Sequence, residues 1–142
     1  MNPMELFTVA HQPVFVMRDF IEMANRTGIK MYLTGSHYFG GHRPTSDWDF
    51  FCEVVPTKWL KEQGFYKDTD AVYTDTLTKA VWSGVFGGVD VHVQIVKDAA
   101  INLKAQLALK STGALKLAHK CTNQQQAEKI LWDLAIEAAQ NA

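Results

Sequence analysis

Residues 35–50 read GSHYFGGHRPTSDWDF, and this stretch decides which fold the chain is expected to have. It begins with Gly35 and Ser36, a pair that at a strand-to-helix turn allows close backbone approach and offers a hydroxyl and N–H groups to a polyphosphate. It ends with Asp47 and Asp49, whose carboxylates share one face of a strand because side chains alternate along it. Two carboxylates placed together suit hard cations such as Mg²⁺. The stretch therefore predicts a phosphate site beside a metal site.

A third acid, Asp90, is expected to complete the metal site. It lies among valines in the strand predicted over residues 89–96, where a buried charge is costly unless it is paired, hydrogen-bonded or bound to metal. If this strand neighbours the strand of the first two acids, three carboxylates converge on one sheet face. The alternative is a structural acid that the backbone or a lysine satisfies. His92 shares the face of Asp90 and is expected to be a hydrogen-bonded histidine, since Mg²⁺ prefers oxygen ligands.

The remaining pattern predicts a small α+β domain. Apolar residues that recur every three or four positions predict helices, and alternating branched and aromatic residues predict strands. The predicted helices are residues 13–26, 56–64, 99–110 and 124–139; the predicted strands are residues 29–34, 47–55, part of 64–73, 77–85 and 89–96, the last two joined as a hairpin. Residues 1–142 are expected to form one domain, with the motifs in residues 29–96 and helices in residues 97–142.

The composition excludes several classes of protein. The chain has 142 residues, of which 47% are hydrophobic, and a formal net charge of -1. It therefore has the material for a core and lacks the basic excess of a large non-specific nucleic-acid surface. Without a signal-peptide pattern or about 20 consecutive apolar residues, it is expected to be soluble and cytoplasmic, with no membrane partner. Cys52 and Cys121 lack the spacing of a disulfide framework or a zinc site and are expected to be core or near-surface thiols.

The motif G-S-x3-G-x5-S-D-x-D resembles the signature of the DNA polymerase beta-like nucleotidyltransferase superfamily. The segment Val89-Asp90-Val91 is similar to the third-acid strand of that family, and the resemblance covers residues 29–96, about half of the chain. It implies the nucleotidyltransferase (polymerase beta-like) fold, a small mixed β-sheet flanked by helices. It also implies a nucleoside triphosphate, expected to be ATP, as the donor substrate, and two Mg²⁺ ions, with Mn²⁺ as the alternative.

The resemblance also implies a role for each motif residue. Gly35 and Ser36 would hold the β- and γ-phosphates. Asp47 and Asp49 would bind the two metal ions, and Asp90 would complete one metal site and help to activate the acceptor. The implied reaction is in-line attack of an acceptor hydroxyl on the α-phosphate, with release of pyrophosphate.

The loop before the acids contributes two further candidates. Arg43 is a candidate phosphate clamp, because a guanidinium can grip two oxygens together, and Ser46 is assigned to the same phosphate-binding set. The four tryptophans are expected in the core rather than as base-stacking platforms, with Trp82 as the best exception because its strand could be next to that of the acids. The basic series of the C-terminal helices is expected to be solvated or to touch an acceptor; it comprises Lys104, Lys110, Lys116 and Lys120.

The acceptor and the assembly stay open at this stage. The acceptor is a protein, a small molecule or an RNA end, and its site would be built from the C-terminal helices, from a second subunit of a homo-oligomer, or from the acceptor itself. The competing hypothesis is a non-catalytic binding or regulatory module of the same fold that acts through a partner protein. A phosphate or nucleotide sensor is a third, weaker hypothesis.

Overall fold

The computed structural model describes residues 3–43, 45–54, 57–69 and 77–141, with the backbone alone for residues 3–12. The elements follow the chain in an order that mixes helices and strands throughout. They are α1 (Pro3–Arg26), β1 (Tyr32–Thr34), α2 (Ser36–Phe39), β2 (Trp48–Cys52), α3 (Thr57–Glu62), β3 (Tyr66–Lys67), β4 (Thr78–Phe86), β5 (Val89–Val96), α4 (Ala99–Thr112), α5 (Leu115–Ala118) and α6 (Gln124–Gln140).

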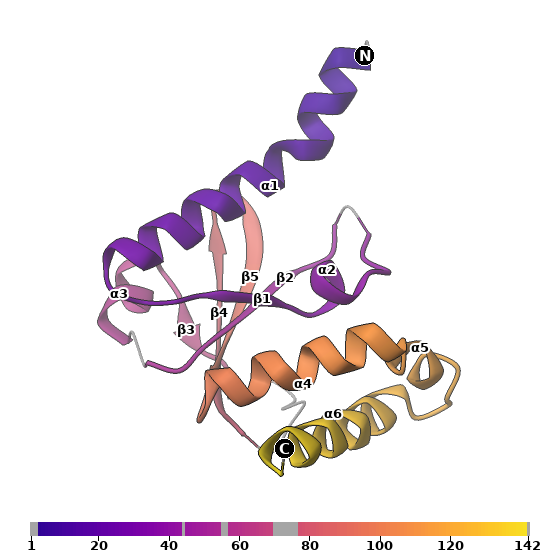
Figure 1. The fold of residues 1–142 in the computed structure, drawn as a ribbon. Coiled ribbons are helices and arrows are strands. Elements are labelled where there is room, and N and C mark those ends of the chain that lie inside the picture. Colours follow the sequence, from indigo (N-terminus) through magenta and orange to yellow (C-terminus); the bar gives the residue numbers. More distant parts are fainter. Residues whose placement is uncertain (1–2, 44, 55–56, 70–76, 142) are drawn as a thin grey trace.

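The five strands form one mixed sheet in the order β1-β2-β5-β4-β3 (Figure 1). Strands β2 and β5 pair in parallel, while the other neighbouring strands pair antiparallel. The predicted α+β class with a small mixed sheet is confirmed. The condition set for the three acids is met in part: β2, which carries Asp49, lies directly beside β5, while Asp47 precedes the first residue of β2, which is shorter than the predicted strand 47–55.

The two faces of the sheet are covered by different helices. On one face, α1 and α3 pack on the strands, and their side chains join one core cluster with Phe50, Val91 and Val93. On the other face, α4 covers β1 and β2, where Phe51 clusters with buried residues of the β5–α4 segment. Helix α6 packs outside α4 around the buried Trp132. Helices therefore cover both faces of the sheet, and on the second face α4 covers only part of it.

Helix α1 is longer than predicted. The sequence predicts a start at Pro13, because proline is favoured in the first turn and disfavoured in a helix interior. The structure instead begins the helix at Pro3 and carries Pro13 inside it, where one backbone donor is missing. The predicted end is confirmed: Gly28 has φ +83°, and its N–H donates to the Asn25 carbonyl.

The predicted elements after the motif are largely confirmed. Strand β5 has the predicted bounds, and both ends of α3, β4, α4 and α6 lie within two residues of the predicted ends. Asp98 caps α4 by accepting a hydrogen bond from the Ile101 N–H at 3.1 Å, as capping aspartates commonly do. The short helix α5 was not predicted. The part of residues 64–73 beyond residue 69 lies outside the described residues.

The tryptophan and cysteine predictions are mostly confirmed. Trp59, Trp82 and Trp132 are buried, as expected for core residues. Trp82 was also the best candidate for a base-stacking platform; its strand β4 does lie beside β5, the strand of Asp90, but its side chain is in the core on the sheet face that α1 covers. Cys52 is buried, which raises the pKa of its thiol to about 12, and Cys121 is exposed.

No helix in the described part of the chain combines the length and the apolar character that crossing a membrane would need.

Candidate functional site

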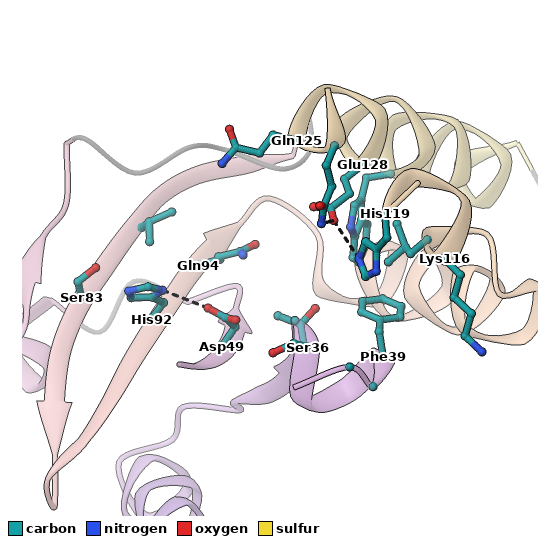
Figure 2. A pocket seen from close by; sticks show the side chains of 18 of the residues that line it. Ser36, Phe39, Asp49, Ser83, His92, Gln94, Lys116, His119, Gln125 and Glu128 are labelled. Atoms are coloured by element: carbon teal, nitrogen blue, oxygen red, sulfur yellow. Dashed lines mark hydrogen bonds and ion pairs between the residues drawn. The ribbon is translucent and has the colours of Figure 1, made fainter. Parts of the chain in front are cut away.

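Strand pairing brings the acids and His92 together. The register of β2 and β5 sets Asp49 level with His92, so that their side chains emerge side by side on the face away from α1. The imidazole Nδ1 lies 3.2 Å from Asp49 Oδ1, and Nε2 lies 3.7 Å from Asp47 Oδ2 (Figure 2 shows the first contact). The predicted hydrogen bond of His92 near the site is confirmed. Its ring bridges the two carboxylates.

The carboxylates of Asp47, Asp49 and Asp68 govern the charge of His92. Its pKa is raised above the usual value first by the hydrogen bond to Asp49, and further by the negative charges of all three acids. Burial opposes this shift, since desolvation penalises the charged imidazolium. The acids thus favour the protonated, positively charged form of the His92 ring that lies between them.

The Gly-Ser turn packs directly against Asp49. Thr34, the last residue of β1, pairs with Asp49, and the chain then turns at Gly35 with φ +69°. A Cβ built on Gly35 would overlap the Asp49 carboxylate, so only glycine allows this approach. Ser36 follows at the start of α2 and faces the same cavity as Asp49 (Figure 2). The predicted proximity of the turn and the acid is present in the structure.

Asp90 does not join this cluster. It is exposed on β5, so the burial cost that singled it out in the sequence does not arise. Continuing the β2–β5 register by one residue sets Asp90 level with Asp47, but Asp90 does not line the cavity described below. Among the described residues, no three histidine, cysteine or acidic side chains are grouped so that they could hold a metal ion by themselves.

The two acids nevertheless fit a cation that a phosphate ligand shares. Asp47 and Asp49 present hard oxygen donors on one face, and the glycine turn leaves the space above Asp49 without a Cβ. Mg²⁺ is commonly bound by one or two carboxylates together with substrate phosphates rather than by a cage of protein ligands. The donor set thus suits Mg²⁺ bound together with a triphosphate.

The loop that carries Arg43 and Ser46 is ordered by its own contacts. The Arg43 N–H donates to Ser46 Oγ at 2.7 Å, and the Ser46 N–H donates to the Arg43 carbonyl at 3.0 Å. The Ser46 hydroxyl is thereby engaged within the loop. Neither residue lines the cavity beside Asp49, although Ser46 directly precedes Asp47 in the chain.

A stack of three rings was missed by the sequence analysis. The centroid of the His37 ring lies 3.7 Å from that of the Trp48 ring, at an interplanar angle of 10°, and 4.3 Å from that of the His42 ring. His37 Nε2 also lies 3.2 Å from the Ser46 carbonyl oxygen. Burial lowers the pKa of His37, which favours its neutral ring. The stack joins α2 and the following loop to the start of β2. In the sequence, the only sign of it is that the three residues lie within the motif stretch 35–50.

A cavity of about 830 Å³ opens from Asp49 toward the C-terminal helices, and Asp47, like Asp90, is not one of its lining residues. Its sheet wall includes Asp49, Ser83 and His92, and Ser83 Oγ donates to Asp68 Oδ2 at 3.0 Å. Its opposite wall comes from α5, α6 and the segment between them (Figure 2), and its polar residues are Lys116, His119, Gln124, Gln125 and Glu128. This volume is within the range of ligand sites.

The helical wall is itself held by polar contacts. His119 Nε2 lies 3.3 Å from Glu128 Oε1, and the Gln124 amide donates to the same oxygen at 3.0 Å. The sequence analysis named the C-terminal helices as one possible acceptor site, and of the polar residues of this wall it singled out Lys116, as part of the basic series. The periodic pattern of an amphipathic helix does not distinguish polar residues that face water from polar residues that face a ligand cavity.

Comparisons of the chain with protein-family models, with curated proteins and with solved structures find no match.

Proposed function

We propose that this chain is a Mg²⁺-dependent nucleotidyltransferase with a polymerase beta-like fold, which transfers a nucleoside monophosphate from a triphosphate to a hydroxyl of an acceptor. The observation that carries the proposal is the packing of the Gly35 turn on Asp49, next to Asp47 and at one end of a ligand-sized cavity. A glycine turn that offers backbone donors beside two carboxylates suits a metal-bound polyphosphate.

Each residue has a part in this proposal. Gly35 and Ser36 would bind the β- and γ-phosphates, and Asp47 and Asp49 would hold Mg²⁺. When bound, the metal would stabilise the charge on the attacking and leaving oxygens. Asp90 is kept as the proposed third acid, because the continued register sets it level with Asp47 and its side chain is exposed.

His92 would orient the carboxylates that hold the metal. Its two ring nitrogens face Asp49 and Asp47 at 3.2 and 3.7 Å, so the ring sets where both carboxylates point. Ordered carboxylates lose less freedom when they bind an ion, and such outer partners commonly tune a metal site.

The acceptor would enter the same cavity from the side of α5 and α6. These helices supply the wall opposite the acids, so an acceptor bound on them would face the phosphate site across the cavity. ATP is the proposed donor, and a protein, a small molecule or an RNA end is the acceptor.

The test is transfer of label from α-labelled triphosphates to a cell extract separated into small molecules, RNA and protein. We expect the wild type to label one fraction, and Asp49→Asn to lower the rate at least a hundredfold because it removes a metal-binding charge worth several kcal/mol in the transition state. Asp19→Asn, on the exposed side of α1, is the matched control and should keep full activity. Undiminished transfer by Asp49→Asn would refute the proposal.

A second candidate function is favoured by the position of His92. Its ring nitrogens face both acids, its pKa is raised, first by the hydrogen bond to Asp49, and Asp90 lies outside the cavity. These features suit a non-catalytic module that keeps the fold and acts through a partner protein. Metal dependence separates the two, because such a module would bind its partner equally well in the presence of a chelator.

A further inference from the structure

The turn at Gly35 and Ser36, which carries the proposed phosphate site, has few contacts of its own to hold it. Strand β1, which leads into the turn, has three residues and pairs with β2 alone. Helix α2, which follows it, is a single turn with no buried residue and no side chain that caps its start. A helix this short is not stable by itself. The position of the turn therefore depends on contacts with neighbouring elements.

Helix α4 lies beside β1 and α2 and contacts the chain on both sides of the turn (Figure 1). The side-chain Nε2 of Gln106 donates to the Leu33 carbonyl oxygen at 3.1 Å, two residues before the glycine of the turn. The Nζ of Lys110 lies 4.3 Å from the centroid of the Tyr38 ring, two residues after the serine of the turn. Gln106 and Lys110 are four residues apart, so they share one side of α4. Their two contacts bracket the turn.

Packing alone does not account for Gln106. Its side chain is only 2% exposed, and its Oε1 has no hydrogen-bond partner among the described residues. A buried acceptor without a partner lowers stability, and an apolar side chain of the same shape would avoid that cost. What the amide adds is its hydrogen bond to the strand that leads into the turn.

We propose that Gln106 and Lys110 are positioning residues that hold the turn at Gly35 and Ser36 in place against Asp49. A Cβ on Gly35 would overlap the Asp49 carboxylate, so a small displacement of the turn changes the space that phosphates and metal would share. Binding sites of this kind need their groups held to within about 0.5 Å. Neither positioning residue lines the cavity, so both act through the turn. The inference rests on the proposed function, because the turn is the proposed phosphate site.

The test uses two measurements on each variant. The first is hydrogen exchange of the Tyr38, Phe39 and Gly40 amides in the ligand-free protein, since these N–H groups donate to the carbonyls of Gly35 and Ser36. Their exchange rate reports how often the turn opens. The second is the calorimetric affinity for Mg²⁺-triphosphate. The first measurement needs no substrate, so a failure of the inference is distinguishable from a failure of the proposed function.

The variant Gln106→Met removes the hydrogen bond to Leu33 and also removes the unpaired Oε1. It conserves volume and does not add an unpaired acceptor overall, so the thermal midpoint should change little. We expect the three amides to exchange faster and the triphosphate to bind roughly tenfold more weakly, as is common when a supporting residue of a metal site is lost.

The matched control is Asn102→Leu, one turn earlier in α4. Asn102 is also 2% exposed and has an unpaired side-chain oxygen, but among the described residues it makes no hydrogen bond to β1. We expect this variant to leave both the amide exchange and the triphosphate affinity near those of the wild type.

Two variants test the contact of Lys110 from both sides. Lys110→Met removes the ammonium group, while Tyr38→Leu removes the ring and keeps the charge. If the contact holds the turn, both should speed the exchange and weaken triphosphate binding by roughly twofold to fivefold, the range of an exposed cation–π contact. Lys104→Met, at an exposed lysine of the same helix, is the control for the loss of charge and should bind normally.

Several results would overturn the inference. Unchanged exchange in Gln106→Met, or faster exchange with unchanged triphosphate affinity, would remove its positioning role. A thermal midpoint that falls much further in Gln106→Met than in Asn102→Leu would make its role structural. Weaker binding by Lys110→Met but not by Tyr38→Leu would make the lysine a direct phosphate contact. A wild type that binds no triphosphate would refute the proposed function, and the inference with it.

Discussion

The same strands carry buried core residues on one face of the sheet and the residues of the candidate site on the other. On β2 and β5, Phe50 and Val93 point toward α1 and are fully buried, while their neighbours Asp49 and His92 point to the other face and line the cavity. Around these strands the face toward α1 is buried, and the site face is partly exposed. The comparison teaches that burial on one face fixes the strands, and thereby sets the acids on the other.

The largest expected effect is the loss of an aromatic ring from the packing face. Phe20 is fully buried, with ring centroids of Phe50, Trp59 and Phe86 within 5.1 to 5.5 Å. Phe20→Ala should therefore lower the free energy of unfolding, measured by urea denaturation, by about 3–5 kcal/mol. Phe15→Ala, at a half-exposed ring on the same helix, should cost less than about 1 kcal/mol. Equal costs for the two would contradict the account of this face.

A smaller effect on stability, with a larger one on binding, is expected at the glycine turn. Gly35→Ala adds a Cβ that meets the Asp49 carboxylate, so it should cost about 1–3 kcal/mol of unfolding free energy and abolish binding of Mg²⁺-triphosphate by calorimetry. Gly28→Ala is the matched control: it has a similar positive φ, but a Cβ there meets nothing within 4 Å. It should lose stability and keep binding. Normal binding by Gly35→Ala would break the link between the turn and the acid.

The smallest expected effect concerns His92 and pH. Because its pKa is raised in the folded protein, its contribution to stability is complete below the unfolded value of about 6.5 and is lost as pH rises through the folded pKa. The half-exposed ring limits this contribution to less than about 1 kcal/mol. His92→Asn should flatten the decrease in unfolding free energy from pH 6 to pH 8, measured in urea.

His37 gives the opposite sign and serves as the comparison. Its pKa is lowered, so the folded state loses stability as pH falls through the unfolded pKa. His37→Asn should therefore raise the relative stability at low pH, whereas His92→Asn should reduce it. Identical pH profiles for the two variants would contradict the opposite environments that the structure assigns to them.

Much of the fold follows from patterns that the sequence carries locally. Alternation over β5, the periodic helices α4 and α6, and the glycine at the end of α1 each predict an element from neighbouring residues. Pro13 misled the prediction of α1, because an interior proline loses only one backbone donor and the helix continues past it.

The site was predicted in part, because its motif residues are close in sequence. Gly35, Asp47 and Asp49 lie within one segment, and their proximity follows from a short strand pairing. The contact of His92 with both acids depends on the exact register of β2 and β5, which alternation does not give. Alternation likewise places Asp90 on the correct face, but it does not tell whether a helix covers that end of the strand.

The most direct test of the central claim is calorimetric binding of each nucleoside triphosphate with Mg²⁺, with a chelator in place of Mg²⁺, and with the Asp49→Asn variant. It needs no knowledge of the acceptor, and Asp19→Asn is the control for the loss of one acidic charge. The account predicts binding of at least one triphosphate that requires the metal and is lost in Asp49→Asn while folding survives. A well-folded wild type that binds no triphosphate, or binding that persists equally in chelator and in the variant, would contradict it.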